Sequence, residues 1–510
     1  MHDLGNLRPG LIAALVVFAL GLSSPAVADD AEGTSARPNI LLILADDLGW
    51  RDVGYHGSEI RTPNIDRVAR EGIELDRFYV QPTCSPTRTA LMTGKSPLRL
   101  GISRPISKNQ QTGLPLEETI LPEYLARSGY QPLMVGKWHL GHYTPDYFPQ
   151  ARGFEHFYGH VTGGIGYWDH NHGGGHDWQR NGETIREEGY STRLIADEAI
   201  RVLASRDRSR STFLYVAFNA PHLPNEAPDE AIARYATIEK EERRIHAAMV
   251  SELDFAIGRV LGAFEREGML DNTIVLFSSD NGGLIPEASP PGLRKVADLL
   301  VDVFGRPVPV AGLEFLVTNV NDGGSDNHPL AGGKGNLGEG GSRVPAAIWW
   351  PGRLEGGTHQ RFMTMSDVLP TLLDAIGAEE SIPADLDGAS QWASLRGEAA
   401  DAATPDYVTT GYAGMALYRA PWKLVDPESP RLYHIYDDPF EEKDLAANQP
   451  AIVETLVAAA NAWPRGPESG ESMLSFLMDP DSFGGAEDRE PWADIARERT
   501  THPHQENPEQ

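Results

Sequence analysis

Three nearly uninterrupted runs of apolar residues constrain the fold of this 510-residue chain more than any other feature. The runs are Asn39–Ala45, Phe213–Phe218 and Thr273–Phe277. Apolar runs of this length are typical of strands that are buried on both faces of a parallel sheet. Helix-like stretches lie between them, at Leu121–Arg127, Arg193–Leu203 and Glu239–Glu267. The pattern predicts an α/β fold in which helices flank a large, mostly parallel sheet.

The length of the chain exceeds what one hydrophobic core usually organises, so we expect more than one domain. Short alternating runs begin near Tyr407 and predict a small antiparallel sheet. We expect a main domain over residues 38–400, a small α+β domain over 401–483, and a tail over 484–510 that is a peripheral helix or disordered. Residues 284–324 have Pro-rich ends and an apolar middle, which predicts an insertion: a lid, an oligomer contact or a plain surface excursion.

Residues 1–28 have the pattern of a signal peptide. The apolar run Leu11–Leu22 is too short to span a membrane, and the small residues Ala26 and Ala28 frame a cleavage site after Ala28. The alternative is a buried core helix. We expect an exported protein, periplasmic or secreted, with no membrane span.

Charge and cysteine content narrow the possible functions. The chain has 44 Lys+Arg against 73 Asp+Glu, a formal net charge of −29, which disfavours nucleic-acid binding because that requires basic faces. A single cysteine, Cys84, excludes an intramolecular disulfide and a cysteine-rich zinc site. In an exported protein without disulfides, this thiol is better explained by chemistry than by stability.

Two stretches carry a family resemblance. Residues 82–94, which include Cys84 and Arg88, match the signature of the type I sulfatases, whose cysteine is oxidised to formylglycine. Residues 129–139 resemble the second sulfatase signature and depart from it at Pro132, where the family prefers Ser or Thr. The resemblance extends over roughly Pro38–Ala446, and it implies the fold shared by alkaline phosphatases and sulfatases.

The resemblance is strongest to the arylsulfatase B group, the N-acetylgalactosamine-4-sulfatase-like enzymes. The stretches that carry it are Gly136–Gly141, Arg152–Gly159, Asp280–Gly283 and Asn327–Leu330, followed by Lys334 and Glu339–Gly341. Ala331 and Gly338 replace the Arg and the aromatic residue that the group usually carries there. The resemblance implies hydrolysis of sulfate esters on a sulfated carbohydrate, such as N-acetylgalactosamine-4-sulfate units of a glycosaminoglycan, or on an aryl sulfate.

The resemblance also assigns roles to individual residues. Formylglycine made from Cys84 by a maturation enzyme hydrates to a diol; one hydroxyl attacks sulfur and the other later expels sulfate. Arg88 holds the formylglycine, Lys137 binds a sulfate oxygen, and His139 deprotonates the second hydroxyl. His222 and Lys334 face the departing oxygen and supply its proton or stabilise its charge.

Polar residues follow the predicted strands and imply a metal site in the same frame. Asp46, Asp47, Asp280 and Asn281 supply hard oxygen ligands, and the formylglycine at position 84 adds another. This set suits one Ca²⁺ better than zinc, and Mg²⁺ fits less well because it demands strict octahedral geometry. The alternative for each pair is a solvated or strand-ending turn.

Other functions stay open at this stage. A phosphonate monoester or phosphodiester hydrolase could use the same scaffold and nucleophile. A non-catalytic protein that binds sulfated glycans is an alternative that is not an enzyme. Alkaline-phosphatase chemistry fits less well because it needs a Ser or Thr nucleophile and a His-rich two-metal cluster. The loop Tyr167–Asp177 contains three histidines and suggests a substrate rim, a solvated loop or, less well, a metal site. The sequence does not determine the oligomeric state.

Overall fold

The computed structural model describes residues 37–172, 175–289, 291–309, 311–398, 405–467 and 490–499, which lie in one compact unit. The predicted signal peptide and most of the predicted 484–510 tail lie outside the described residues. None of the helices in the described ranges is long and apolar enough to cross a membrane. The predicted domain boundaries stay predictions.

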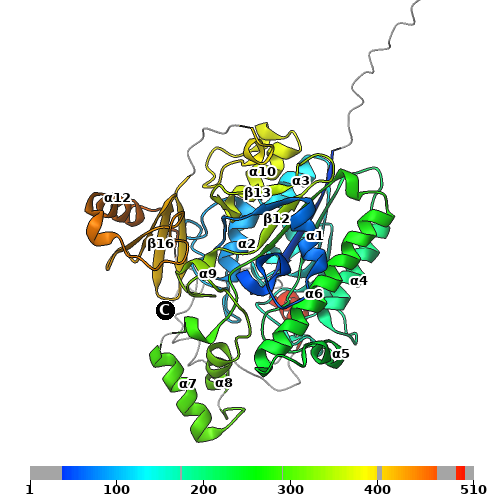
Figure 1. Ribbon diagram of the computed structural model, residues 1–510. Coiled ribbons are helices and arrows are strands. Elements are labelled where there is room, and N and C mark those ends of the chain that lie inside the picture. Colours follow the sequence, from blue (N-terminus) through cyan, green and yellow to red (C-terminus); the bar gives the residue numbers. More distant parts are fainter. Residues whose placement is uncertain are drawn as a thin grey trace, which may run out of the picture. The chain divides into compact units, whose positions relative to one another are not determined.

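A mixed sheet dominates the fold (Figure 1). In the described residues it has ten strands, ordered β13-β2-β12-β11-β1-β10-β4-β5-β8-β9. Their bounds are β1 (Asn39–Ala45), β2 (Ile73–Leu75), β4 (Gln131–Lys137), β5 (His156–His160), β8 (Gln179–Arg180), β9 (Glu183–Thr184), β10 (Thr212–Ala217), β11 (Thr273–Ser279), β12 (Ala346–Trp349) and β13 (Gly357–His359). The five neighbours β11, β1, β10, β4 and β5 are mutually parallel, whereas β12 and β8 pair antiparallel to them. The expectation of a large, mostly parallel sheet is confirmed.

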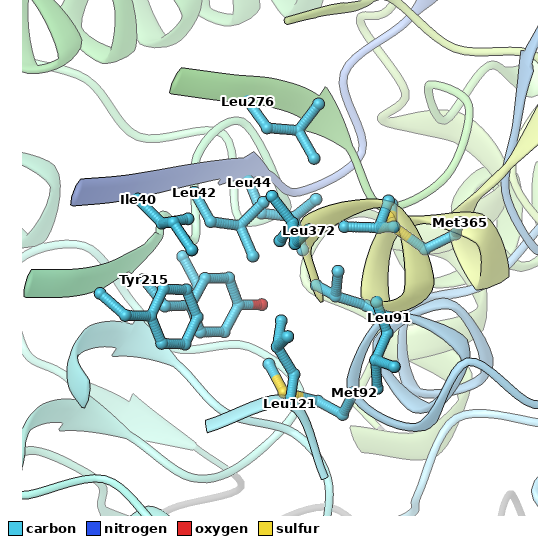
Figure 2. Packing of buried hydrophobic residues seen from close by; sticks show 14 of the residues in the cluster. Ile40, Leu42, Leu44, Leu91, Met92, Leu121, Tyr215, Leu276, Met365 and Leu372 are labelled. Atoms are coloured by element: carbon cyan, nitrogen blue, oxygen red, sulfur yellow. The ribbon is translucent and has the colours of Figure 1, made fainter. Parts of the chain in front are cut away.

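Helices cover both faces of the sheet because successive side chains of a buried strand point to opposite sides. On β1, Ile40, Leu42 and Leu44 pack into one core cluster, and Leu41 and Ile43 pack into another. Figure 2 shows the first cluster. Its helices are α2 (Cys84–Thr93), α3 (Leu121–Arg127) and α10 (Val368–Ala375). The second cluster includes α1 (Pro63–Glu71), α4 (Ser191–Ala204) and α6 (Glu241–Arg266).

The predicted small antiparallel sheet near the end of the chain is confirmed. It consists of β15 (Tyr407–Gly411), β16 (Gly414–Arg419), β17 (Trp422–Val425) and β18 (Arg431–His434). Helix α12 (Pro450–Asn461) packs on it through Leu456, against Leu417 and Leu424 (Figure 1). Helix α14 (Trp492–Arg499) lies elsewhere, and its Trp492 indole N–H donates to the His172 carbonyl at 3.2 Å.

The segment 284–324, which the sequence marked only as an insertion, folds as two helices. They are α7 (Pro291–Phe304) and α8 (Ala311–Asn321), which pack on each other. Other elements of the described residues are β3 (Phe78–Tyr79), β6 (Asn171–His172), β7 (Gly175–His176), β14 (Met363–Thr364), α5 (Asp229–Ile232), α9 (Glu339–Ser342) and α11 (Trp392–Leu395).

Candidate active site

The polar residues singled out in the sequence gather at one edge of the main sheet. Asp46 follows β1, Asp280 follows β11, Lys137 ends β4, and His222 lies shortly after β10. Because these four strands are parallel neighbours, their carboxyl ends meet at the same edge, where ligands bind in sheets of this kind. Cys84 is the first residue of α2.

The site contains three cationic side chains, and each of them is paired with one carboxylate. The Lys137 Nζ donates to Asp46 Oδ2 at 2.6 Å, and the Lys334 Nζ donates to Asp47 Oδ2 at 2.7 Å. A further pair joins Arg88 to Asp280, whose Oδ2 accepts from Nε and Nη2 at 3.0 and 2.8 Å. All six side chains are buried, so the pairs are held in a low dielectric where charges interact strongly.

Two oxygen atoms in the site fit a cation. Asp46 Oδ1 and Asn281 Oδ1 are buried and take part in no hydrogen bond with any described residue. A buried polar atom without a partner is costly, and a bound cation would satisfy both oxygens. Asp46, Asp47 and His222 also offer ligand atoms that lie within 4.8 Å of one another. The donor set therefore suits a hard cation, although the sequence had assigned His222 only to the departing oxygen.

The surroundings shift the pKa values of Asp46 and Asp47 in opposite directions. Burial and the charge of Asp280 raise the pKa of Asp46 to about 8. Burial alone would raise the pKa of Asp47 as well, but Lys334 and His222 hold it below its ordinary value. Close carboxylates repel one another in the ionised form, and a cation bound among them relieves this repulsion.

Cys84 is almost completely buried, with 2% of its surface exposed. Burial raises the pKa of its thiol, and the nearby charges of Lys137 and Lys334 oppose only part of this rise. The thiolate is the reactive form of cysteine, so a raised pKa makes an unmodified Cys84 a poor nucleophile. This environment fits a thiol that is converted to another group better than one that attacks a substrate itself.

The two histidines predicted to act in the site are both held in the neutral form. Burial and Lys137 lower the pKa of His139 well below its usual value, and burial and Lys334 lower that of His222 to about 3. The His139 Nε2 lies 3.0 Å from the Ile106 carbonyl, while its Nδ1 is buried without a hydrogen-bond partner among the described residues. The His222 Nε2 lies 3.7 Å from Asp47 Oδ2.

Backbone strain marks two of these positions. Asp47 and His139 have φ values of 67° and 56°, in the left-handed region that residues with a side chain rarely adopt. Such strain persists where the surrounding structure fixes it, and it clusters at functional sites. It turns the chain sharply after β1 and β4, so that consecutive polar residues reach the same site.

A pair of glycines forms a wall of the site that the sequence analysis did not identify. A Cβ atom added at Gly163 would lie 2.8 Å from the His139 ring, and one added at Gly164 would lie 3.0 Å from the His222 ring. Bare backbone therefore passes close to both histidines. The two glycines shortly after a strand were the available signal, but glycine carries no chemical group that marks a site.

Tyr412 is a second residue that sequence reasoning missed. It lies in the turn between β15 and β16, and its backbone N–H donates to the Gly335 carbonyl at 2.9 Å. Gly335 follows Lys334, so the small sheet reaches the edge of the site at this point. The Tyr412 side chain is 47% exposed and is free to contact a bound molecule.

The histidines of the Tyr167–Asp177 loop bond to backbone carbonyls. His170 Nε2 pairs with the Gly189 carbonyl at 3.1 Å, and His176 Nε2 pairs with the Ile185 carbonyl at 2.7 Å. No metal-ligating cluster forms there among the residues with described positions. Trp168 is 48% exposed, and the preceding Tyr167 donates its hydroxyl hydrogen to the carbonyls of Asn219 and His222 at 2.9 and 2.8 Å.

Comparisons with known proteins agree on one family. The sulfatase family model matches residues 38–378. Arylsulfatase J of Mus musculus is 36% identical over 373 residues, which cover 71% of this chain and 56% of that protein. N-acetylgalactosamine-6-sulfatase of Mus musculus is 33% identical over 399 residues, covering 73% of this chain and 68% of that protein. The solved structure of Ps i-CgsB in complex with k-i-k-neocarrahexaose is 28% identical, covers 88% of this chain and 98% of that one, and has a TM-score of 0.73.

Proposed function

The chain belongs to the sulfatase family, whose members are sulfuric ester hydrolases, and we propose that it cleaves the S–O bond of sulfate esters with a nucleophile formed from Cys84. The observation that carries the proposal is the position of Cys84. It begins α2 in a buried site that holds the cationic side chains of Arg88, Lys137 and Lys334, each paired with an aspartate whose charge a bound metal cation would also neutralise. A sulfate ester is an anion, and such a site binds it and stabilises the charge that develops during cleavage.

We assign the chemistry of the nucleophile to a formylglycine made from Cys84 by a maturation enzyme. When formed, this group supplies a hydrated aldehyde with one hydroxyl to attack and a second to release sulfate. Arg88 orients the residue, since it anchors the first turn of α2 to Asp280 and to the Lys137 carbonyl. Neutral His139 is able to accept the proton of the second hydroxyl.

Lys137 and Lys334 bind the sulfate oxygens and the departing oxygen in this proposal. Burial would lower the pKa of Lys334, but Asp47 and the other acidic groups around it together raise it, so its ammonium stays charged. The lowered pKa of His222 keeps that imidazole neutral. Of the two residues that face the departing oxygen, Lys334 therefore carries the proton and His222 contributes a hydrogen bond.

We propose that one Ca²⁺ completes the site, held by Asp46, Asp47, Asp280, Asn281 and the oxygen of the formylglycine at position 84. The unpartnered oxygens Asp46 Oδ1 and Asn281 Oδ1 support this assignment. The cation supplies positive charge that polarises the sulfate group. Ca²⁺ accepts irregular sets of oxygen ligands, whereas Mg²⁺ requires a regular octahedron, which favours Ca²⁺ in a site crowded with protein groups.

We propose that the substrate is a sulfated carbohydrate, with N-acetylgalactosamine-4-sulfate units as the first candidate. The backbone at Gly163 and Gly164 lies against both histidines, and exposed Trp168 and Tyr412 offer rings on which a sugar can stack. The relative named N-acetylgalactosamine-6-sulfatase makes the 6-sulfate the direct competitor. The predicted signal peptide places the enzyme outside the cytoplasm, in the periplasm or secreted.

The proposal is tested with matured protein on a panel of defined chondroitin and dermatan sulfate oligosaccharides, with inorganic sulfate measured by ion chromatography. We expect release from the 4-O-sulfated members, and none from the Cys84→Ala variant. Release only from 6-O-sulfated members would correct the position of the sulfate, and no release from any sulfated sugar or aryl sulfate would refute the function.

Matched aryl esters separate the remaining alternatives. A phosphonate monoester or phosphodiester hydrolase would act faster on an aryl phosphodiester than on the corresponding aryl sulfate, whereas we expect the reverse. A glycan-binding protein would retain its affinity in the Cys84→Ala variant and show no turnover in the parent. Turnover by the parent that the variant lacks excludes this alternative.

A further inference from the structure

The α7–α8 hairpin carries an unusual share of exposed apolar surface. Of the eleven large apolar side chains that are exposed in the described part of the chain, six lie on it. They are Leu293, Val296, Leu299, Val303, Phe304 and Phe315, with exposed fractions of 36% to 62%. Contiguous apolar patches of this kind mark interaction sites on soluble proteins.

The hairpin is an ordered element rather than a loose loop. Ala297, Val308, Val317 and Val320 form a small core of its own between the two helices (Figure 1). Arg306 fixes the turn through Glu314, which it contacts at 3.1 Å, and through Asp322 at 2.6 Å. This core buries the inner face of α7, whereas no described residue covers Val296, Leu299 and Val303 on its outer face.

The outer face of α7 has the symmetry of a surface that pairs with itself. Val296, Leu299 and Val303 follow the i, i+3, i+7 spacing of one helix face and are 48%, 60% and 62% exposed. Lys295 and Asp302 are both exposed and lie two helical turns apart, so they share one flank of this face. The charged pair has its midpoint between residues 298 and 299, and the stripe Val296–Val303 has its midpoint one residue further along the helix.

We propose that α7 is the contact through which two copies of this chain associate, with their α7 helices antiparallel about a twofold axis at residues 298–299. A twofold axis there brings the apolar stripes together and keeps like flanks on the same side. Lys295 of each copy then faces Asp302 of the other, and this pair occurs twice. A parallel arrangement about a twofold axis would instead place the two charged flanks on opposite sides of the helix pair, so that Lys295 and Asp302 would not meet.

A membrane surface fits this face less well. Helices that bind at membrane surfaces carry an excess of Lys and Arg along their polar face, whereas α7 balances Arg294 and Lys295 with Asp298 and Asp302. The chain as a whole has a net charge of −29, which anionic lipid headgroups repel. One helix pair is a small interface, so we expect weak, concentration-dependent association.

The test is sedimentation equilibrium of the full-length protein over a wide concentration range. We expect a reversible monomer–dimer equilibrium that the Val303→Asp variant abolishes. The Lys295→Asp variant places two acidic residues opposite each other and should weaken association by about tenfold. Adding Asp302→Lys to it exchanges the two charges and should restore dimerisation to near the parent value.

Several outcomes would overturn the proposal. These are a monomer at every concentration, a dimer that Val303→Asp leaves intact, or a charge-exchanged double variant that stays as weak as the single variant. Binding of the parent to anionic vesicles in place of self-association would assign the face to a membrane. The rate of sulfate release by each variant at low concentration checks that it is folded, because α7 lies outside the catalytic site.

Discussion

At the scale of the single residue, two glycines without side chains shape the site as much as its reactive groups do. Gly163 and Gly164 leave backbone against the rings of His139 and His222, and there is no space for a Cβ atom at Gly163 without a shift of the His139 ring. A displacement of about 1 Å in a catalytic group can cost on the order of 100-fold in rate.

The Gly163→Ala variant should therefore lose activity without losing stability. We expect kcat/KM for an aryl sulfate to fall by on the order of 100-fold, because the added methyl group displaces the His139 ring. Gly357→Ala is the matched control, since a Cβ atom there meets nothing within 4 Å. Equal activity of the two variants would show that His139 does not need its present position.

Sequence reasoning identified polar residues that the structure brings together at one edge of the sheet, but not the residues that shape the space around them. Asp46 and Asp280 follow apolar strands, and Cys84 stands in a recognisable signature, so each carried a local signal. Gly163 has no chemical group, and Tyr412 reaches the site only because a distant hairpin folds against the Lys334 loop. Contacts between segments far apart in the sequence depend on tertiary packing, so the residues next to Tyr412 in the sequence do not indicate them.

At the scale of the element, Asp52 joins the segment that follows β1 to helix α6. It lies in a 3-10 turn (Trp50–Asp52), is fully buried, and accepts from Gly49 N at 3.0 Å and from Asp326 N at 3.1 Å. His246 Nε2 lies 2.9 Å from it, and Arg243 donates to its other oxygen. Burial alone would raise the pKa of Asp52, but His246 and Arg243 hold it well below its ordinary value.

The stabilisation from Asp52 should depend on pH. Because its folded-state pKa is depressed, this stabilisation is present above the unfolded pKa of about 4 and is lost as the pH falls further. We expect Asp52→Asn to lower the free energy of unfolding at pH 7 by about 3–5 kcal/mol, because it removes the buried carboxylate that the Arg243 guanidinium contacts. The difference from the parent should narrow below about pH 4, as urea unfolding would show. A difference independent of pH would contradict the assignment.

Lys423 connects the small sheet to the main domain. This buried residue of β17 lies 3.0 Å from Glu339 Oε1 and 2.8 Å from Glu441 Oε1, and the Tyr79 hydroxyl donates to Glu339 Oε2 at 2.6 Å. Its ammonium thus lies between two acidic groups that water reaches poorly.

Replacing Lys423 by methionine should destabilise the protein strongly. We expect the free energy of unfolding to fall by about 3–5 kcal/mol, because two carboxylates lose their buried partner. Exposed Lys443→Met is the control and should change it by less than about 0.5 kcal/mol. Denaturant unfolding measures both, and equal effects would show that the buried network contributes nothing specific.

The elements were predictable where the apolar pattern was continuous. The strand at Asn39–Ala45 and the helix at Leu121–Arg127 have the predicted bounds. Strands β4 and β5 were not predicted, since Gly136 and Gly159 interrupt their apolar patterns where the backbone packs closely. At Gly136 a Cβ atom would lie 1.8 Å from the Ala217 carbonyl oxygen.

At the scale of the whole molecule, the sequence predicted which layers the chain forms but not the order of its strands. Strand order depends on contacts between segments far apart, such as β1 pairing with β10 and β11. That order makes the carboxyl ends of β11, β1, β10 and β4 adjacent and brings three buried carboxylates together. A cation bound there links loops from distant parts of the chain.

Removal of the metal should therefore lower the stability of the entire fold. We expect chelation to lower the Tm and Ca²⁺ to restore it more fully than Mg²⁺; a ligand about a hundredfold above its Kd adds about 2.7 kcal/mol. The Asn281→Leu variant should lose the response to Ca²⁺. A Tm that is insensitive to chelator in the parent would count against a structural role for the cation.

The most direct test of the account concerns the origin of the nucleophile. Preparations made with different amounts of a formylglycine-generating enzyme would be assayed for sulfate release from one aryl sulfate, and the converted fraction of Cys84 would be measured in each by peptide mass spectrometry. We expect a rate proportional to the converted fraction, with none in unconverted protein. A rate independent of that fraction would contradict it, because hydrolysis would then proceed without the group proposed to attack sulfur.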